Sequence, residues 1–341
     1  MSSAIQAVTP TSPSNFKRRP PPFLIRCLLG LWLQGILRPI IRHLEKTGKA
    51  VSKIGGRAAQ RRERQEAKNP FRGYLPTRHD VFVATYAKSG TNWMMQIAHQ
   101  LLFHGKGEFE HIHCVVPWPD TVAMGPMRGY AIPIEDDCVW KASPEQKRVI
   151  KTHFDWDLLP YSEEARYIMV IRDPKDIFVS NYFFVRQILR GAMPKVETWF
   201  HLFLSEGFML GGSWAVNTAG YWAQRQRSNV LVVSFKSMKQ DLPGTVRRVA
   251  EFLGVRASAE MLAEVCEKSS FAYMKEHDDQ FCMWQLNPWG KKVEMVRKGT
   301  QGGSSELLSP AQQRELDAYF IAELKRLGSD FPYAEFCDLA K

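Results

Sequence analysis

The sequence predicts an α/β fold, in which a single domain holds a central parallel sheet flanked by helices. Three observations lead to this prediction. Short, almost wholly apolar runs recur between residues 69 and 341, segments with helical periodicity separate them, and no internal repeat is visible. Such runs are typical of strands buried on both faces, and strands that alternate with helices form parallel sheets covered on both sides.

The predicted elements alternate along this region. The predicted strands are residues 80–86, 148–152, 166–171 and 230–234. The predicted helices are residues 93–103, 174–190, 214–227, 243–253 and 310–327. We expect the folded domain to begin near Asn69-Pro70 and to comprise residues 69–341.

The positive charge is concentrated at one end of the chain. The 341 residues are 45% hydrophobic, which suffices for one large core or two small ones. Residues 1–70 contain 14 of the 46 Lys and Arg but only three of the 35 acidic residues, so this segment accounts for the net charge of +11. The rest of the chain is neutral overall. This split disfavours a nucleic-acid-binding core, and no nucleic-acid partner is expected.

The cysteines and histidines do not predict a metal site. Six cysteines are scattered along the chain without a C-x-x-C pair, which disfavours a disulfide scaffold or a zinc ribbon. The run His111-Ile112-His113-Cys114 contains metal-binding residue types, but such residues more often lie on an ordinary strand or loop.

Residues 1–68 are predicted to form a basic, partly disordered N-terminal arm. Residues 1–22 are rich in Ser, Thr and Pro, a composition typical of disorder. Residues 23–44 have the pattern of an amphipathic helix, and residues 46–68 that of a charged helix or linker.

The helix at 23–44 has three competing interpretations. Its apolar face would comprise Ile25, Leu28, Leu29, Trp32, Leu33, Ile36, Leu37, Ile40 and Ile41, with Arg26, Gln34, Arg38 and Arg42 opposite. A membrane-spanning helix needs about 20 mostly apolar residues. The uncharged run between Arg26 and Arg38 is shorter, and Pro39 predicts a kink.

We therefore favour a basic amphipathic helix on an anionic membrane surface, in a cytoplasmic protein that is peripheral on a membrane. The alternatives are packing against the body or a second subunit, and a signal anchor or targeting peptide that would make the protein membrane-anchored or organelle-targeted.

The first chemical signal is the turn Thr85-Tyr86-Ala87-Lys88-Ser89-Gly90-Thr91-Asn92-Trp93, between a predicted strand and a predicted helix. This position presents backbone N–H groups and a positive helix end to an anion. Lys88 adds a positive charge, and Gly90 allows close approach of the backbone. The nucleoside-triphosphatase pattern G-x-x-x-x-G-K-S/T is absent, since Lys88 precedes Gly90.

This turn resembles the Y-P-K-S-G-T-x-W signature of sulfotransferases that use 3′-phosphoadenosine-5′-phosphosulfate (PAPS). Three further segments resemble the family's motifs in the family's order. Lys151-Thr152-His153 is similar to K-T-H, residues 171–180 to R-N/D-P-x-D-x-x-V-S, and Arg297-Lys298-Gly299 to R-K-G. The resemblance covers roughly residues 80–303 and implies the P-loop-kinase-like sulfotransferase fold.

The resemblance also implies the roles of individual residues. The implied catalytic residues are His153 as base, with Lys88 and Lys151. The implied nucleotide-binding residues are Lys88, Ser89, Gly90, Thr91, Asn92, Trp93, Arg172, Ser180, Phe235, Ser270, Phe271, Arg297, Lys298 and Gly299. PAPS would be the cofactor, 3′,5′-adenosine bisphosphate (PAP) the product, and no metal would be needed.

The chemistry is consistent with these residue types. Sulfuryl transfer resembles phosphoryl transfer, in which cationic groups stabilise charge on equatorial oxygens. His153 has an ordinary pKa of about 6.5 and could accept the proton of an acceptor hydroxyl or amine. Arg172 could hold the 3′-phosphate with two parallel bonds. The alternatives are a structural role for His153 and an ion pair of Arg172 with Asp173 or Asp176.

The chain departs from the family pattern at several positions. Ala87 replaces a proline, Asn92 stands where Thr is common, and Phe235 replaces a tyrosine near the nucleotide. The family's G-D-W-K after R-K-G is missing here, which makes the conformation of residues 297–305 uncertain. The family's dimer motif K-x-x-x-T-V-x-x-x-E is not visible either, and we predict no oligomeric state.

The acceptor is predicted to be small and hydrophobic or lipid-like. Aromatic residues crowd the segments beside the catalytic motifs, namely Phe103, Trp118, Phe154, Trp156, Tyr182, Phe183, Phe184, Trp284 and Trp289. We expect Trp118, Phe154 and Phe184 to contact the acceptor, although such residues can also be ordinary core. Two other functions remain as alternatives: a nucleotide kinase-like enzyme, and a non-catalytic, membrane-associated nucleotide-binding protein.

Overall fold

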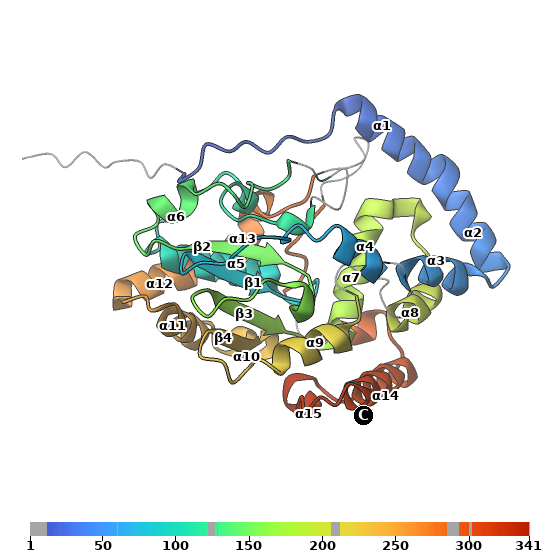
Figure 1. Ribbon diagram of the computed structural model, residues 1–341. Coiled ribbons are helices and arrows are strands. Elements are labelled where there is room, and N and C mark those ends of the chain that lie inside the picture. The colour runs from blue at the N-terminus through green and yellow to red at the C-terminus, as the bar shows by residue number, and fades with distance from the viewer. Residues whose placement is uncertain are drawn as a thin grey trace, which may run out of the picture.

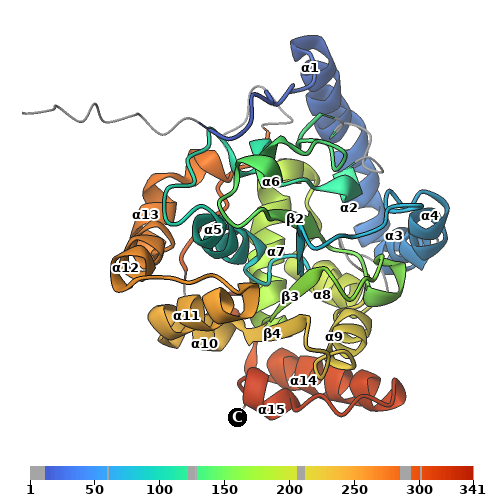
Figure 2. The same ribbon diagram turned by 60° about the vertical axis from the view of Figure 1, so that its left-hand side comes forward.

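The computed structural model describes residues 12–59, 61–121, 127, 129–205, 212–284, 293–299 and 302–340. Its centre is a four-stranded parallel sheet with the order β2-β1-β3-β4 (Figures 1 and 2). The strands are β1 (Asp80–Ala84), β2 (Arg148–Thr152), β3 (Arg166–Ile171) and β4 (Val230–Ser234). The predicted single α/β domain with a central parallel sheet is therefore confirmed.

The strands form where the apolar runs predict them, because both faces of the sheet are covered. Val81 and Val83 point into the core on one face of the sheet, and Phe82 and Ala84 into the core on the other. This is the alternation expected of successive residues in a strand. β1 ends at Ala84, two residues earlier than predicted, because the turn of residues 85–93 follows directly. We call this turn the phosphate turn.

Two groups of helices cover the two faces (Figures 1 and 2). One face packs against α5 (Thr91–Leu102), α10 (Phe235–Gln240), α11 (Leu242–Leu253), α12 (Ala259–Lys268) and α13 (Phe271–Glu276). The other packs against α7 (Pro174–Leu189), α8 (Val196–Leu204), α9 (Trp214–Trp222), α14 (Pro310–Arg326) and α15 (Tyr333–Phe336). Shorter elements are α6 (Cys138–Ala142) and turns of 3₁₀-helix at Ile112–Cys114, Trp156–Leu158, Arg190–Ala192, Asp278–Gln280 and Gly303–Glu306.

The predicted helices lie close to their expected positions. α9 ends at Trp222, five residues before its predicted end, and α5 begins at Thr91, two residues early. The sequence analysis did not find α8, α10, α12 and α13. These helices are short: α10 and α13 have six residues each, α8 has nine and α12 has ten.

The N-terminal arm contains a long helix. α1 (Phe23–Trp32) continues through a π-helical turn, η1 (Leu33–Leu37), into α2 (Arg38–Lys46). Figure 1 shows α1 and α2 in line, so the kink predicted at Pro39 is replaced by the π-turn directly before it. A wider turn of this kind can accommodate the proline ring and the helical hydrogen bond that proline cannot donate. α3 (Ala50–Ala59) and α4 (Arg61–Ala67) follow.

This helix contacts the body along one narrow edge. Leu33 and Ile41 are buried, and the Gln34 side chain donates a hydrogen bond to the Leu189 carbonyl at 3.2 Å. The Glu45 carboxylate accepts bonds from the Lys195 backbone N–H (2.7 Å) and the Thr198 hydroxyl (2.9 Å). The arm thus packs against α7 and α8, as one of the predicted alternatives has it.

Most of the predicted apolar face nevertheless points to solvent. The exposed apolar side chains of this helix are Phe23, Leu24, Ile25, Leu28, Leu31, Trp32, Ile36 and Ile40, with exposed fractions of 47–69%. We refer to these eight residues as the outer apolar face.

Candidate functional site

A cavity of about 350 Å³ opens where the carboxyl ends of β1, β2 and β3 meet the amino ends of α5, α7, α10 and α13. Four motifs predicted from the sequence meet in it, although the first and the last are more than 200 residues apart in the chain. The predicted site residues that line it are Lys88, Gly90, Thr91, Asn92, Trp93, Trp118, Lys151, His153, Arg172, Ser180, Phe184, Phe235, Ser270, Phe271, Arg297, Lys298 and Gly299.

Two predicted residues do not line the cavity in the described part of the chain. Ser89 lies beneath the phosphate turn, where it is buried. Phe154 was expected to contact the acceptor, but it packs in the core against Phe71, with ring centroids 5.9 Å apart. Alternation after β2 explains this difference, because His153 faces the cavity and the next side chain must face away.

The phosphate turn has the geometry of an anion site. Gly90 has φ +101°, and a Cβ at this position would lie 2.8 Å from the Phe235 ring. Glycine is therefore required both for the conformation and for the close packing. The Thr91 hydroxyl is 2.6 Å from that of Thr85 and so belongs to an internal bond of the turn. The buried Ser89 hydroxyl has no hydrogen-bond partner among the described residues.

Lys88 lies at the centre of the cavity in a left-handed conformation, with φ +72°. Its Nζ atom is 4.1 Å from the centre of the Phe184 ring. Burial, with the nearby Arg172 charge, lowers the pKa of Lys88 to about 8. The ammonium is therefore still mostly protonated at neutral pH, and an anionic ligand would increase that fraction.

His153 follows β2, and its ring orientation is set by the turn after β1. Its Nδ1 atom is 2.8 Å from the Thr85 carbonyl oxygen. A carbonyl can only accept, so Nδ1 carries the proton and the neutral ring has its lone pair on Nε2. This is the tautomer that a general base requires.

The sequence analysis missed Asp120, which holds the end of β2 in place. One Asp120 oxygen accepts a bond from the His153 backbone N–H at 2.7 Å, and the other accepts from the Thr152 hydroxyl at 2.9 Å. Burial raises the pKa of Asp120, whereas these donors oppose the rise. A single acidic residue after the apolar run Val115–Trp118 was the only sequence signal.

Lys151 lies on the same side of β2 as His153, two residues away. Its Nζ atom is 3.4 Å from the centre of the Trp118 ring, and the residue is 4% exposed. Burial lowers the pKa of Lys151 to about 7, with Lys88 adding to the effect and Asp120 opposing it. Near neutral pH this side chain therefore exchanges between the charged and neutral forms.

Arg172 joins the turn after β3 to the phosphate turn. Its Nη1 donates to the Lys88 carbonyl at 3.1 Å, and its guanidinium stacks 4.2 Å from the centre of the Phe235 ring. It also pairs with Asp176 at 3.6 Å, which is the alternative that the sequence analysis left open. Arg172 therefore forms the ion pair with Asp176 and lines the cavity at the same time.

Asp176 in turn holds residues 297–299 and 302–306, which we call the late segment. Its two oxygens accept bonds from the Gly303 N–H (3.1 Å) and the Gly302 N–H (3.2 Å). Arg297 and Lys298 both contact Glu306 at 3.0 Å. Gly299 has φ +60°, and a Cβ there would lie 2.2 Å from the Phe271 ring. Residues 300 and 301, like Trp289, lie outside the described residues.

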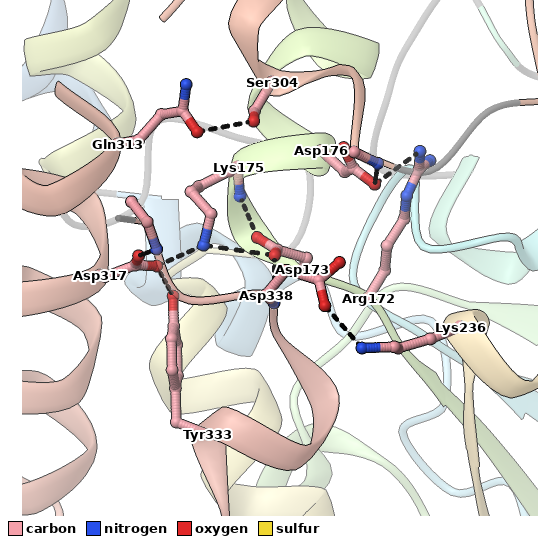
Figure 3. A network of polar contacts seen from close by, with 12 residues as sticks. Arg172, Asp173, Lys175, Asp176, Lys236, Ser304, Gln313, Asp317, Tyr333 and Asp338 are labelled. Atoms are coloured by element: carbon pink, nitrogen blue, oxygen red, sulfur yellow. Dashed lines mark hydrogen bonds and ion pairs between the residues drawn. The ribbon is translucent and has the colours of Figure 1, made fainter. Parts of the chain in front are cut away.

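A buried polar network supports the turn that carries Arg172 (Figure 3). Lys175 pairs with Asp173 at 3.2 Å and with Asp317 of α14. The Tyr333 hydroxyl donates to Asp317 at 2.7 Å, and the Asp338 N–H donates to Asp173 at 3.0 Å. The carboxyl-terminal segment is thus bonded directly beneath the predicted 3′-phosphate site.

The remaining end of the cavity is aromatic. Trp118 stacks on His113 (centroids 5.3 Å apart) and meets His153 edge-on (5.6 Å). His113 has Nδ1 3.0 Å from the Val116 carbonyl, and burial, with the nearby Lys151, holds its pKa well below the ordinary value. Tyr130 completes this end. From the sequence, His113 was expected on an ordinary strand or loop, and its contact with Trp118 was not predicted. Among the described residues, no group of three or more His, Cys, Asp or Glu side chains could hold a metal ion.

A parallel sheet with a turn suited to an anion after its first strand, facing a histidine of the right tautomer, is consistent with a group-transfer enzyme. The family model described as "Sulfotransferase domain" matches residues 78–328. Sulfotransferase 2A1 of Macaca fascicularis is 30% identical over 259 residues, covering 74% of this chain and 87% of the relative. The 3-alpha-hydroxysteroid sulfotransferase of Cavia porcellus is 28% identical over 253 residues, or 72% and 84% of the two chains.

Solved structures agree in fold. Retinol dehydratase in complex with androsterone and PAP has a TM-score of 0.63 at 20% identity, covering 80% of this chain and 88% of the other. A mouse sulfotransferase complexed with PAP has a TM-score of 0.55 at 21% identity, covering 76% and 90%. The chain belongs to the sulfotransferase family. The predicted family, fold and enzyme class, a PAPS-dependent sulfotransferase, are confirmed.

Proposed function

We propose that the cavity binds PAPS between the phosphate turn and the late segment. Lys88, the backbone N–H groups of the turn and Ser89 would hold the 5′-phosphosulfate. The 3′-phosphate would be held by Arg172, Ser180 and residues 297–299. The adenine ring of PAPS would lie between Trp93, Phe235 and Phe271. The observation that carries this proposal is the convergence of Lys88, Arg172, Lys151 and His153 on one cavity.

When bound, PAPS supplies the sulfuryl group. His153 Nε2 takes the proton of the acceptor hydroxyl or amine as the acceptor atom forms its bond to sulfur and the bond from sulfur to the phosphate oxygen breaks. Lys88 and Lys151 balance the negative charge on the sulfuryl and leaving oxygens. Asp120 positions His153 through its backbone rather than by contact with the reacting atoms. The products are the sulfated acceptor and PAP.

The acceptor is proposed to be a small hydrophobic alcohol, phenol or amine. The aromatic end of the cavity supports this class, because Trp118, Tyr130 and Phe184 offer a large apolar surface beside the polar His153 and Lys151. The name of the guinea pig relative, a hydroxysteroid sulfotransferase, points to the same class.

The direct test is transfer of ³⁵S from labelled PAPS to a panel of a 3-hydroxysteroid, an alkylphenol and an alkylamine, in EDTA. We expect labelled product from the wild-type protein and from an Arg78→Ala variant, because Arg78 is exposed and away from the cavity. A Lys88→Met variant should lose most of the transfer. If the wild-type protein transfers no label but hydrolyses or transfers phosphate from ATP with magnesium, the kinase-like alternative replaces this proposal.

We also propose that the outer apolar face contacts an anionic membrane surface, with the protein peripheral on the membrane. Within the described ranges, one helix, Phe23–Lys46, has a length and a mean hydropathy (1.5) that would permit a membrane span. The bonds of Gln34 and Glu45 to the body support a helix that lies along the surface, since a spanning helix would have to leave them.

Sedimentation with vesicles of phosphatidylcholine and phosphatidylglycerol tests this contact. We expect binding that high salt weakens and that alkaline carbonate reverses. Binding that resists carbonate would mean that the helix spans the membrane. A salt-independent lack of binding would refute the contact.

A further inference from the structure

We infer that the acceptor enters the aromatic end of the cavity, here called the acceptor end, directly from the membrane. The acceptor is then an amphiphile dissolved in the membrane, with an apolar body and one hydroxyl or amine. This inference rests on the proposed sulfotransferase function and on the proposed membrane contact. It identifies where the acceptor comes from, which neither of those proposals does.

The first argument is the path of the segment that precedes α1. The Arg19 N–H donates to the Gly129 carbonyl at 3.2 Å, and the Arg18 guanidinium lies 5.3 Å from the centre of the Tyr130 ring. Tyr130 is 1% exposed and lines the aromatic end of the cavity. The arm is therefore part of the structure around the acceptor end, not a distant appendage (Figure 1).

The second argument is distance along the chain. Phe23, the first residue of α1, follows Arg19 by four residues, and an extended chain advances at most about 3.6 Å per residue. The start of the outer apolar face thus lies within roughly 14 Å of the backbone that is bonded to Gly129. Phe23 and Leu24 at this end are 66% and 69% exposed. An amphiphile that leaves the membrane near them has a short route to Tyr130.

The third argument is charge, which favours a lipid surface over a second copy of the chain. The outer apolar face contains no charged residue, and exposed basic residues flank it at both ends. These are Arg19 before the helix and Arg42, Lys46, Lys49 and Lys53 at and after its end, whereas Lys17 is paired with Glu110 at 2.6 Å. Two such faces packed together would bring like charges close in either orientation, whereas anionic headgroups neutralise both clusters.

The fourth argument is the chemistry of the aromatic end. Trp118 and Tyr130 are nearly fully buried, and the nearby His113 is held neutral by burial and by Lys151. The polar groups that could reach an acceptor here are concentrated around His153 and Lys151. An apolar body with a single polar end matches this distribution, and a charged, water-soluble acceptor does not.

The experiment compares two routes of delivery for the same acceptors. A 3-hydroxysteroid, a long-chain alkylphenol and a long-chain alcohol are each supplied in phosphatidylcholine–phosphatidylglycerol vesicles or as a cyclodextrin complex, with ³⁵S-labelled PAPS. The full-length protein is tested with a Leu28→Glu, Ile36→Glu double variant, because both side chains are more than half exposed. Leu75→Glu is the matched control, since Leu75 is 82% exposed and lies outside the helix.

We expect the double variant to lose at least tenfold of its transfer from vesicles, and to stay within twofold of wild type with cyclodextrin complexes. The Leu75→Glu control should match wild type by both routes. Equal loss or no loss by the two routes would overturn the inference. A dimer that dissociates in the double variant would assign the face to a second copy instead. No transfer by either route would refute the proposed function rather than the route.

Discussion

The two ends of the cavity are built in different ways. The end proposed to bind the nucleotide consists of short consecutive motifs, most of them placed by the end of a strand or the start of a helix: residues 88–93, 172–180, 270–271 and 297–299. The aromatic end, proposed to bind the acceptor, consists of single side chains such as His113, Trp118 and Tyr130, which belong to none of the four motifs. The first is specified locally, whereas the second depends on tertiary packing.

This difference has a functional meaning. The nucleotide is always the same, so a fixed set of backbone groups and cations can hold it. An acceptor site can change by single substitutions without disturbing that set. The account therefore predicts that changes at one end leave the other end largely intact, and the following experiments test this separation.

The largest effect is expected for His153→Ala. Loss of the base should lower kcat by about 10²- to 10⁴-fold, with little change in the affinity for PAP. His201→Ala is the control, because this histidine is on the surface of α8. Steady-state kinetics with a hydroxysteroid acceptor provide the measurement. A variant within threefold of wild type would mean that another group removes the proton.

A comparably large effect, on stability, is expected for Lys175→Met. This change leaves the Asp173 and Asp317 carboxylates buried without their shared cation, which typically costs about 3–5 kcal/mol. Urea unfolding should show the loss of free energy, and PAP should restore only part of it. Lys325→Met is a matched control, since Lys325 is exposed on α14 and is not among the residues that line the cavity. If Lys175→Met is as stable as this control, the network in Figure 3 does not support the 3′-phosphate turn.

A smaller effect is expected for Trp118→Ala. The ring contributes apolar surface to the acceptor and contacts Lys151 and His153. Removing it should raise the KM of a hydrophobic acceptor by about 10-fold or more, while the KM of PAPS changes less than threefold. Equal effects on both KM values would show that the two ends are not separable.

The smallest effect is a pH dependence of nucleotide binding. Burial lowers the pKa of Lys151 to about 7 and that of Lys88 to about 8, and the protonated forms attract the phosphates. As pH rises through these values the cations are lost, so the affinity for PAP should fall between pH 6.5 and 9 by roughly a factor of ten. Calorimetry in buffers of different ionisation enthalpy should show proton uptake on binding at pH 7.5. Lys151→Met should reduce that uptake, and an unchanged uptake would contradict the assignment.

The sequence predicted the sheet well because its strands are apolar runs buried on both faces, such as Val230–Ser234. It indicated segments that line one cavity, because Lys88–Trp93 and Arg172–Ser180 are contiguous and each carries its own chemistry. It did not predict Asp120, whose role depends on the fold that brings it to the end of β2. Nor did it predict that Phe154 turns into the core, although strand alternation from His153 could have indicated this.

The N-terminal arm illustrates the same limit. Helical periodicity predicted the helix, and the sequence left open whether its apolar residues face the body, a second subunit or a membrane. The structure divides them: Leu33 and Ile41 are buried on the body, and the outer apolar face is exposed. A helical wheel alone cannot make this division, because it depends on the surfaces of α7 and α8.

The central claim is that PAP binding depends on Arg172 and does not depend on His153, the proposed catalytic base. Calorimetric titration of PAP into the wild-type protein, His153→Ala and Arg172→Ala tests it most directly. We predict that His153→Ala binds PAP with an affinity within threefold of wild type. Loss of a charge-assisted bond to the 3′-phosphate is typically worth about 1.5–3 kcal/mol, so Arg172→Ala should bind roughly 10- to 150-fold more weakly. Wild-type affinity in Arg172→Ala, or equal binding of ATP with magnesium, would contradict the account.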